Sequence, residues 1–528
     1  MLISIAGFKR CVAVWLMLIV TTAFAQHTNV KVGSALGNGD PQEPSIIVNY
    51  KNTDHMLIGA NKDNYYYSTD AGLNWVHGQL TSPLGVWGDP CVIVDTTGSF
   101  YFFHLSDPAG VAWVDRIMCQ KTGRLGGKWS DGTYMGLNGS KLQDKEWAAV
   151  DVRTNAIYVT WTQFDQYGSI DPKHFSNIMF SKSTDAGETW SPALRINTIS
   201  GDCRDDDNTV EGAVPAIGPE GEIYVSWAGP AGIVFDKSND RGATWLDTDI
   251  FVSDIPGGWA LTVPGIMRCN GMPVTACDVS NGPHRGTIYI NWSDQRHGVS
   301  DTDVWLSKST DAGETWSAPI RVNDDGQGKH QFFTWMTIDQ TNGYLYFVFY
   351  DRRYHADTST DVVCAVSRDG GETFINFKVS ETPFAPNQSV FFGDYTNISG
   401  HNNVIRPVWA RLDNSDLSLW TAIIDPGQIT ELPRPAPDVQ PTGFEFVSVY
   451  PNPFNASIMI EYIIPRSGEV VVKVFDVLGK EIETVFSGNQ AEGEHQVSWL
   501  AEGVASGIYF VHAKFANELK TTKVTLSK

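Results

Sequence analysis

The sequence predicts an all-β protein in which repeated four-stranded units close into a ring and a small β-sandwich follows at the C-terminus. One observation is a pattern, Ser-x-Asp-x-Gly-x-x-aromatic, that occurs five times and is best preserved as SKSTDAGETWS at 181–191 and 307–317. Another is that each copy follows short apolar strands separated by turns. With 528 residues, of which 42% are hydrophobic, the chain can bury a large core and form more than one domain.

Residues 1–25 form the first predicted segment, a secretory signal peptide. Lys9 and Arg10 precede an apolar run at 11–20, and the small-residue pattern Ala23-Phe24-Ala25 follows before Gln26. A basic part, an apolar part and small residues in this order are typical of a cleaved export signal. No later segment reaches the roughly 18 uninterrupted apolar residues of a membrane span, so we expect none in the mature chain.

Export would place the cysteines of the mature chain in an oxidising compartment. Six cysteines remain after the signal peptide is removed, an even number that is compatible with disulfides. Cys269 and Cys277 are the closest pair and could close a short loop. Ordinary buried thiols are the alternative, above all for Cys91, Cys119 and Cys364, which lie in strand-like runs.

The charge balance excludes two classes of partner. The formal net charge is −22, and the chain has no run rich in Lys and Arg. Nucleic acids and anionic membranes both require a concentrated positive field. The sequence therefore predicts neither a nucleic-acid partner nor a membrane-surface partner.

The recurring pattern suits a tight hairpin turn. Its Asp can accept hydrogen bonds from backbone N–H groups, its Gly permits positive φ, and its aromatic ring can pack on the layer beneath. The pattern resembles the Asp-box, or BNR repeat, of sialidase-like β-propellers. In that family the box lies on the face away from the substrate, so the resemblance implies a structural role for five aspartates: Asp70, Asp185, Asp240, Asp311 and Asp369.

The repeats predict a propeller domain at 26–424 with seven blades. Seven units can be counted, one of which has a degenerate box at 121–129. The last unit lacks a fourth strand, and we expect Asn29–Gly33 to supply it by pairing with the strand LSLWTAII, which would close the ring. Six blades are the alternative, because the sialidases that this domain resembles have six.

Composition changes abruptly after Ile424. Residues 425–443 are rich in Pro and lack periodicity, as a semi-rigid linker does. Residues 444–528 alternate apolar and polar residues in short strands, which predicts a β-sandwich. With YPNPF at 450–454 and SGIY at 506–509, this segment resembles the C-terminal sorting domain of the type IX secretion system. The resemblance implies handling by that machinery and a secreted or cell-surface location.

Acidic side chains recur where the first strand of a unit begins. They are Glu43, Asp89, Glu146, Glu211 and Asp394. We expect them to ring the central channel, where like charges would raise some pKa values or recruit a cation such as Ca²⁺. Capping of neighbouring backbone N–H groups is the alternative.

Two loops between second and third strands mix carboxylates with guanidinium groups. Such a mixture suits an acidic sugar or another polar glycan. A surface salt-bridge network is the alternative. The residues concerned are Asp294 and Arg296 in one loop, and Asp351, Arg352 and Arg353 in the other.

The resemblance to sialidases implies roles for three residues. Tyr395 is similar to the nucleophilic tyrosine of the family, Glu211 to its activating glutamate, and Asp89 to its acid/base. Two arginines that bind the substrate carboxylate are missing, because the chain has Gln42-Glu43-Pro44 and Trp227-Ala228-Gly229 in their places.

The sequence therefore predicts an exported, glycan-directed propeller with an incomplete sialidase site. Two classes of function remain open. One is a glycoside hydrolase of sialidase-like type that requires no cofactor. The other is a non-catalytic adhesion or binding module that holds a glycan, a glycoprotein, another protein or Ca²⁺.

Overall fold

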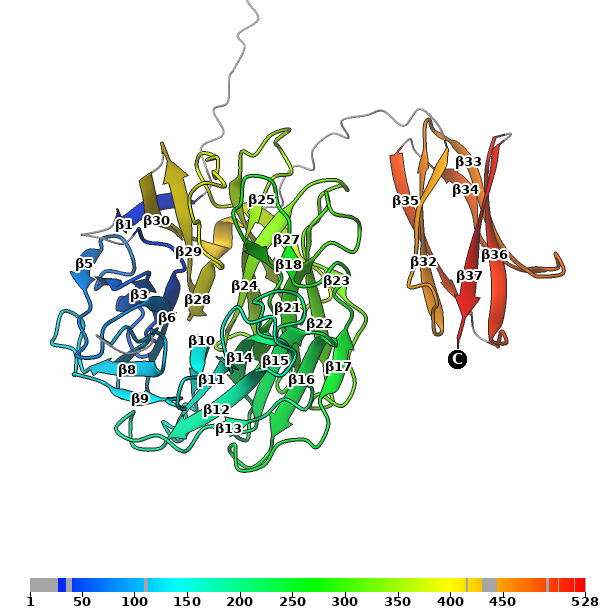
Figure 1. Cartoon of the computed structure of the whole chain (residues 1–528). Helices are drawn as coiled ribbons and strands as arrows, with labels where there is room; N and C mark the ends of the chain where they lie inside the picture. The colour runs from blue at the N-terminus through cyan, green and yellow to red at the C-terminus, as the bar shows by residue number, and fades with distance from the viewer. Residues whose placement is uncertain are drawn as a thin grey trace, which may run out of the picture. The chain divides into compact units, whose positions relative to one another are not determined.

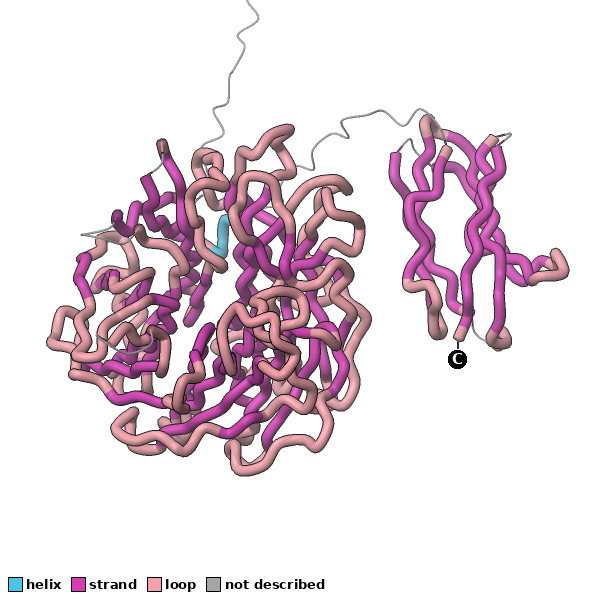
Figure 2. Tube along the Cα trace, in the orientation of Figure 1, coloured by secondary structure: helices cyan, strands magenta, loops and turns pink. Residues whose placement is uncertain are grey.

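The computed structural model describes residues 27–34, 40–108, 113–414, 416–429, 444–490, 493–501, 503–516 and 518–527. The predicted signal peptide and most of the predicted linker lie outside these residues. The chain divides into two compact units, one ending at Arg434 and one beginning at Pro435 (Figure 1). Strands dominate both units, and the helical structure among the described residues is a single 3-10 turn, η1 (Pro426–Gln428) (Figure 2).

The first unit is built from four-stranded antiparallel sheets, which we call blades. The sheet topology gives seven of them within 28–423, one for each repeat unit of the sequence. Their strands, blade by blade, are β2 (Ser45–Val48), β3 (Met56–Ala60), β4 (Asn64–Ser68), β5 (Val76–Gln79); β6 (Gly88–Val94), β7 (Phe100–Leu105), β8 (Ile117–Thr122), β9 (Thr133–Met135); β10 (Leu142–Val150), β11 (Ile157–Phe164), β12 (Ser176–Ser183), β13 (Leu194–Arg195); β14 (Glu211–Ile217), β15 (Ile223–Gly229), β16 (Gly232–Ser238), β17 (Ile250–Ser253); β20 (Val274–Cys277), β21 (Ile288–Asp294), β22 (Asp303–Ser309), β23 (Ile320–Arg321); β24 (Gln331–Asp339), β25 (Tyr344–Asp351), β26 (Asp361–Ser367), β27 (Ile375–Lys378); and β28 (Asn397–His401), β29 (Val404–Asp413), β30 (Asp416–Ile423) with β1 (Thr28–Ser34).

The first strands of the blades form the inner wall of the ring. Each contacts the first strand of the next blade, in the order β2, β6, β10, β14, β20, β24, β28 and back to β2. A two-stranded sheet, β18 (Ala260–Leu261) and β19 (Cys269–Asn270), lies between blades 4 and 5 in the chain. The starts of these seven inner strands therefore meet at one end of a central channel.

The ring is closed by the N-terminal strand, as the sequence predicted. β1 pairs antiparallel with β30, with Thr28 opposite Ile423 and Val30 opposite Thr421. The side chain of Asn29 adds a hydrogen bond to the backbone O of Val379, at 2.6 Å, in the preceding blade. This closure pairs the outer edge of blade 7 with a strand from the other end of the domain.

The five recurring turns have the predicted geometry. In the copy at Asp311, Oδ1 accepts hydrogen bonds from Ser309 Oγ (2.7 Å) and Thr315 N (3.0 Å), and Oδ2 accepts one from Thr315 Oγ1 (2.6 Å). Trp316 packs edge-on against Phe235 of the preceding blade, with ring centroids 5.0 Å apart. Gly313 has φ +85°, and a Cβ there would meet the same phenylalanine ring at 2.3 Å. The turn thus joins one blade to the one before it.

The disulfide between Cys269 and Cys277 that the sequence left possible is not formed. All six cysteines of the described residues are free and buried. Cys269 belongs to the core cluster that contains Phe332 and Val348, whereas Cys277 belongs to a different cluster with Trp292. Because β19 and β20 present the two thiols to separate cores, they fill apolar space as ordinary buried side chains.

The second unit is the β-sandwich that the sequence predicted. One sheet has the order β31-β32-β35 and the other β34-β33-β36-β37. Buried residues such as Ile460, Val472, Trp499 and Val511 form its core. Its strands are β31 (Glu445–Tyr450), β32 (Ser457–Ile464), β33 (Gly468–Asp476), β34 (Glu481–Gln490), β35 (Gly493–Leu500), β36 (Gly507–Phe515) and β37 (Glu518–Leu526).

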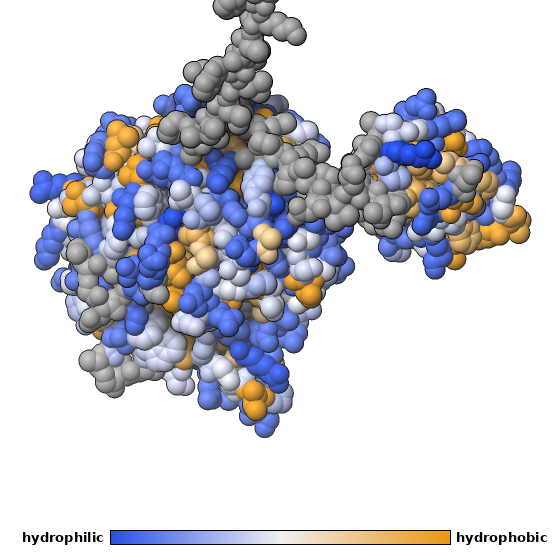
Figure 3. All heavy atoms as spheres, turned by 90° about the horizontal axis from the view of Figure 1, so that it is seen from above, coloured by the Kyte–Doolittle hydropathy of each residue, from blue (hydrophilic) through white to orange (hydrophobic). Residues whose placement is uncertain are grey.

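The described part of the chain contains no helix long and apolar enough to cross a membrane. On the face that is visible from above, the described surface is mostly hydrophilic, with separate small hydrophobic patches (Figure 3).

Candidate functional site

The inner strands of the first three blades begin with charged residues in a left-handed conformation. Glu43, Asp89 and Lys145 have φ of 53°, 51° and 52°. Each stands two residues before a regular strand pair, and register shifts mark bulges at this point in β6 and β10. A non-glycine residue in this region carries backbone strain, which the surrounding structure must support. We call the starts of the inner strands the channel mouth.

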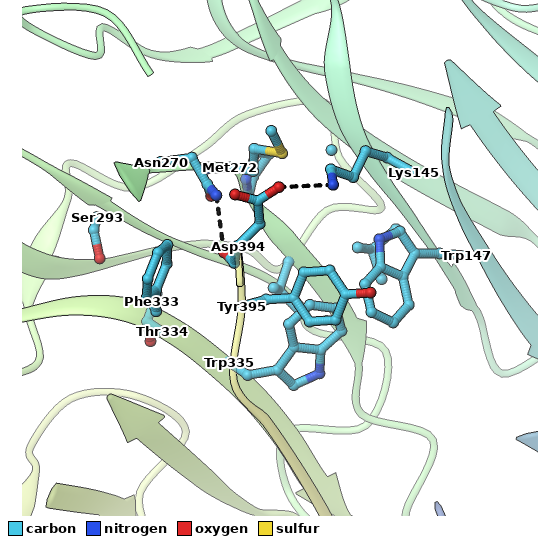
Figure 4. A pocket seen from close by; sticks show the side chains of 14 residues that line it. Lys145, Trp147, Asn270, Met272, Ser293, Phe333, Thr334, Trp335, Asp394 and Tyr395 are labelled. Atoms are coloured by element: carbon cyan, nitrogen blue, oxygen red, sulfur yellow. Dashed lines mark hydrogen bonds and ion pairs between the residues drawn. The ribbon is translucent and has the colours of Figure 1, made fainter. Parts of the chain in front are cut away.

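Lys145 lies at the centre of the charged part of the channel mouth. Its Nζ is 2.7 Å from Asp394 Oδ2 (Figure 4). It also lies 3.1 Å from Asp89 Oδ2 and 3.6 Å from Glu43 Oε1, so it joins blades 1, 2, 3 and 7. The ammonium thus lies among three of the five carboxylates that stand at the starts of the inner strands. Neighbouring carboxylates hold the pKa of Lys145 well above its usual value, although burial acts in the other direction.

A second cation extends this network toward the surface. Arg268 donates from Nε to Asp394 Oδ1 at 2.9 Å and forms a further ion pair with Oδ2 of the same residue. Its Nη1 lies 3.3 Å from Asp205 Oδ2, which also accepts a hydrogen bond from Tyr167 Oη. Burial opposes ionisation of Asp394, but the charges of Lys145 and Arg268 outweigh it and hold the pKa of Asp394 below the ordinary value.

Two neighbouring carboxyl groups at the channel mouth have pKa values that move in opposite directions. Burial and the charge of Asp89 raise the pKa of Glu43 well above its usual value. Burial also acts on Asp89, but the ammonium of Lys145 and a hydrogen bond shared with Glu43 lower the pKa of Asp89. Asn61 supports both, because its Oδ1 accepts from Asp89 N at 2.7 Å and its Nδ2 donates to Glu43 Oε2. Of the two, Glu43 therefore holds a proton more readily than Asp89 does.

Glu146 and Glu211 lie at the same end of the channel, and Glu211 shares a side-chain hydrogen bond with Asp205. Both side chains are buried. Burial raises the pKa of each well above its usual value, with the charges of Asp89 and Asp144 adding for Glu146, and those of Asp205 and Asp144 for Glu211. Both carboxyl groups therefore take up a proton more readily than an exposed glutamate does.

An aromatic cluster fills the channel below these charges. Trp147 lies 4.3 Å from Trp335 and 5.1 Å from Tyr395, measured between ring centroids (Figure 4). These rings, with Asp394, Lys145 and residues of blades 4 to 6, line a cavity of about 30 Å³. This volume suits about one water molecule and is smaller than a sugar ring.

Three aromatic rings contact one another next to the charged network, and we call them the aromatic platform. The ring centroids of Trp87 and Trp113 are 5.2 Å apart with the planes tilted by 50°, and Trp113 and Tyr167 meet edge to face at 6.0 Å. Trp113 is 40% exposed, and the Nζ of Lys62 lies 3.8 Å from the ring centroid of Trp87. Because Tyr167 donates to Asp205, the platform connects directly to the charged network.

The structure brings most of the predicted site residues to one place, the channel mouth. Tyr395 and Glu211 both lie there, and among the described residues no hydrogen bond joins them, since Glu211 shares a side-chain hydrogen bond with Asp205. Burial, Asp89 and Glu43 raise the pKa of Tyr395 well above its usual value.

The two mixed loops form ion pairs of their own. Arg296 pairs with Asp294 at 2.5 Å, and Arg353 pairs with Asp351 at 2.8 Å. These pairs correspond to the salt-bridge alternative of the sequence analysis. Arg352 donates to the backbone O of Pro264 at 2.7 Å, and burial lowers its pKa to about 10.

Sequence reasoning missed several residues of the site. Lys145 stands directly before Glu146, so the motif DKEW at 144–147 carried a signal for a cation beside the acidic ring. Arg268 and the platform residues Trp87 and Trp113 come from loops without a repeated pattern. Only the closed ring brings Arg268 to Asp394.

Comparisons with known proteins identify the C-terminal unit. Residues 448–527 match the model of the secretion system C-terminal sorting domain family. The chain therefore carries a signal for export through type IX secretion, to the cell surface or beyond it. No curated protein matches the chain significantly.

Several solved structures resemble the propeller. They include the NanB sialidase of Streptococcus pneumoniae (9% identity, 71% of this chain and 84% of that chain, TM-score 0.43) and an ulvan lyase of a polysaccharide lyase family (11% identity, 74% and 95%, TM-score 0.45). A protein of unknown function from Dyadobacter fermentans is also similar (11% identity, 73% and 99%, TM-score 0.41).

Proposed function

We propose that the exported propeller binds a neutral glycan chain at the channel mouth, with sugar rings stacked on the aromatic platform. The observation that supports this most is the continuity from Trp113 through Tyr167 and Asp205 to Arg268 and Asp394. The apolar face of a sugar ring packs well on an exposed aromatic ring, while its hydroxyl groups need polar and charged partners beside it. Aromatic rings beside a hydrogen-bonding network supply both.

The charges at the channel mouth favour a neutral sugar over an acidic one. Lys145 and Arg268 are both paired with carboxylates, so neither guanidinium nor ammonium is free to bind a sugar carboxylate. Arg406, a further candidate, donates to the backbone O of Ala71 at 2.9 Å. An acidic sugar would therefore meet Asp89 and Asp394 without a matching cation.

Binding is tested on a glycan array that carries neutral oligosaccharides and their sialylated counterparts. We expect binding to neutral chains, and we expect Trp113→Ala to lose most of it because the outer ring of the platform is removed. Tyr134→Ala is the matched control, since Tyr134 is 46% exposed on β9 of the same blade but lies outside the platform. Equal losses in the two variants, or a preference for sialylated chains, would contradict the proposal.

A further inference from the structure

We propose that the loop between β21 and β22 holds a divalent transition-metal site of the Zn²⁺ class, formed by His297, Asp301 and Asp303. Each residue offers one ligand atom, and these atoms lie within 4.8 Å of one another. Among the described residues, no other group of three His, Cys, Asp or Glu side chains meets this condition. The site lies on blade 5 and shares no residue with the channel mouth or the aromatic platform.

The loop conformation brings the three side chains together. β21 ends at Asp294, which is paired with Asp303 at the start of β22. Between them the backbone turns back, with Asp301 N donating to Gly298 O at 3.0 Å. This turn places His297 Nδ1 2.7 Å from Asp303 Oδ2.

The two aspartates of the site are deeply buried and lie close together. Asp301 and Asp303 are 4% and 1% exposed. Asp303 accepts from His297 and from Asn323 Nδ2 (2.6 Å), with Arg321 3.6 Å away. Asp301 accepts only backbone hydrogen bonds, from Gly328 and from Lys329 N, the latter at 3.3 Å, and burial beside Asp303 raises its pKa. A buried carboxylate beside another carboxylate is costly, and a bound dication would compensate both.

Blade 6 contains the same loop without the third ligand. HGVSDTD at 297–303 aligns without a gap with HADTSTD at 355–361. His355 Nε2 lies 2.9 Å from Asp361 Oδ2, so the contact between histidine and aspartate is common to both blades and clamps the loop. Ser359 stands where blade 5 has Asp301, and Lys378 pairs with Asp361 at 2.7 Å. The additional carboxylate in blade 5 is therefore not needed to clamp the loop.

The donor set points to the class of metal. One imidazole and two carboxylates suit Zn²⁺, which binds such ligands at about 2.0–2.2 Å and accepts three protein ligands with water in the remaining position. Ca²⁺ prefers about six to eight oxygen ligands, which this loop does not supply. The metal takes the place of the hydrogen bond between His297 Nδ1 and Asp303, so the imidazole binds through Nδ1 in its neutral form.

Calorimetric titration of the chelator-treated full chain with ZnCl₂ tests the site. We expect one saturable site per chain, and we expect Asp301→Ser, which copies blade 6, to weaken it by about tenfold or more. His355→Asn is the matched control and should bind as the unmodified chain does. Melting without metal establishes that both variants are folded.

Three results would overturn the proposal. The first is the absence of saturable Zn²⁺ binding by the unmodified chain. The second is an unchanged Zn²⁺ affinity in Asp301→Ser, or an equal loss of Zn²⁺ affinity in His355→Asn. Either result would place the metal outside the site formed by His297, Asp301 and Asp303. The third is tighter binding of CaCl₂ than of ZnCl₂ in a parallel titration, which would contradict the class of metal.

Discussion

Replacing Lys145 by methionine removes the positive charge around which the channel mouth is built. The Nζ of Lys145 is 2.7 Å from Asp394 and 3.1 Å from Asp89, and its side chain is only 6% exposed. Breaking a buried ion pair from one side leaves an uncompensated carboxylate and costs about 3–5 kcal/mol. We expect Lys145→Met to lower the free energy of unfolding of the propeller by this amount at pH 7.

Lys141 offers a matched control within the same chain. Its Nζ lies 2.7 Å from Asp165, the same distance as in the buried pair, but the two side chains are 39% and 22% exposed. Solvent screens such a pair, so Lys141→Met should cost about 0–1 kcal/mol. Urea unfolding of the full chain, followed by circular dichroism, compares the propeller transition of the two variants.

The pH dependence provides an independent test of the same reasoning. Asp89 and Asp394 have pKa values lowered in the fold, so their contribution to stability is present above their unfolded pKa of about 4 and is lost as pH falls through the folded value. Without Lys145, burial raises both pKa values, and the carboxyl groups take up protons at higher pH. The loss in Lys145→Met should therefore shrink as pH falls from 7 toward about 4. Equal losses for Lys145→Met and Lys141→Met, or a loss independent of pH, would refute the argument.

Three further predictions concern the turns, a buried histidine and the predicted nucleophile. Asp311→Ala should cost about 1 kcal/mol, because its exposed carboxylate gives up the bonds of one turn, and glycan binding should not change. Hydrogen bonds from Thr315 lower the pKa of Asp311 to about 2, so its contribution to stability is present above about pH 4 and disappears toward pH 2. An unchanged melting temperature of Asp311→Ala at pH 7 would contradict this prediction. Burial and Arg352 lower the pKa of His330 to about 4, so stability should fall as pH drops from about 6.5 to 4, by up to about 1.4 kcal/mol per pH unit. Urea unfolding of His330→Asn should show a smaller slope over that range, and an identical slope would exclude His330 as its source. The full chain should release little fluorophore from a 4-methylumbelliferyl sialoside, and turnover that Tyr395→Phe abolishes would restore the sialidase hypothesis.

The repeated turns and the missing fourth strand were readable from the sequence because they depend on local chemistry. Asp311, Gly313 and Trp316 recur at fixed spacing, since the turn needs a carboxylate, positive φ and a ring at those positions. The acidic strand starts, such as Glu43 and Asp89, were also visible as a recurring feature. Because each of these residues stands before the first strand of a repeat unit, the repeat predicts that they lie at the same end of the channel.

Sequence alone determined the all-β class, the repeat, the ring closure by the N-terminal strand and the C-terminal sorting domain, because each depends on short patterns with a local physical cause. The tertiary structure decided which charges meet. Lys145 lies between residues more than fifty positions before it and more than two hundred after it, and Arg268 reaches Asp394 from a loop without a pattern. It also decided the raised pKa values of Glu43, Glu146 and Glu211, because burial and neighbouring carboxylates cause these shifts and both arise only when the blades close into a ring.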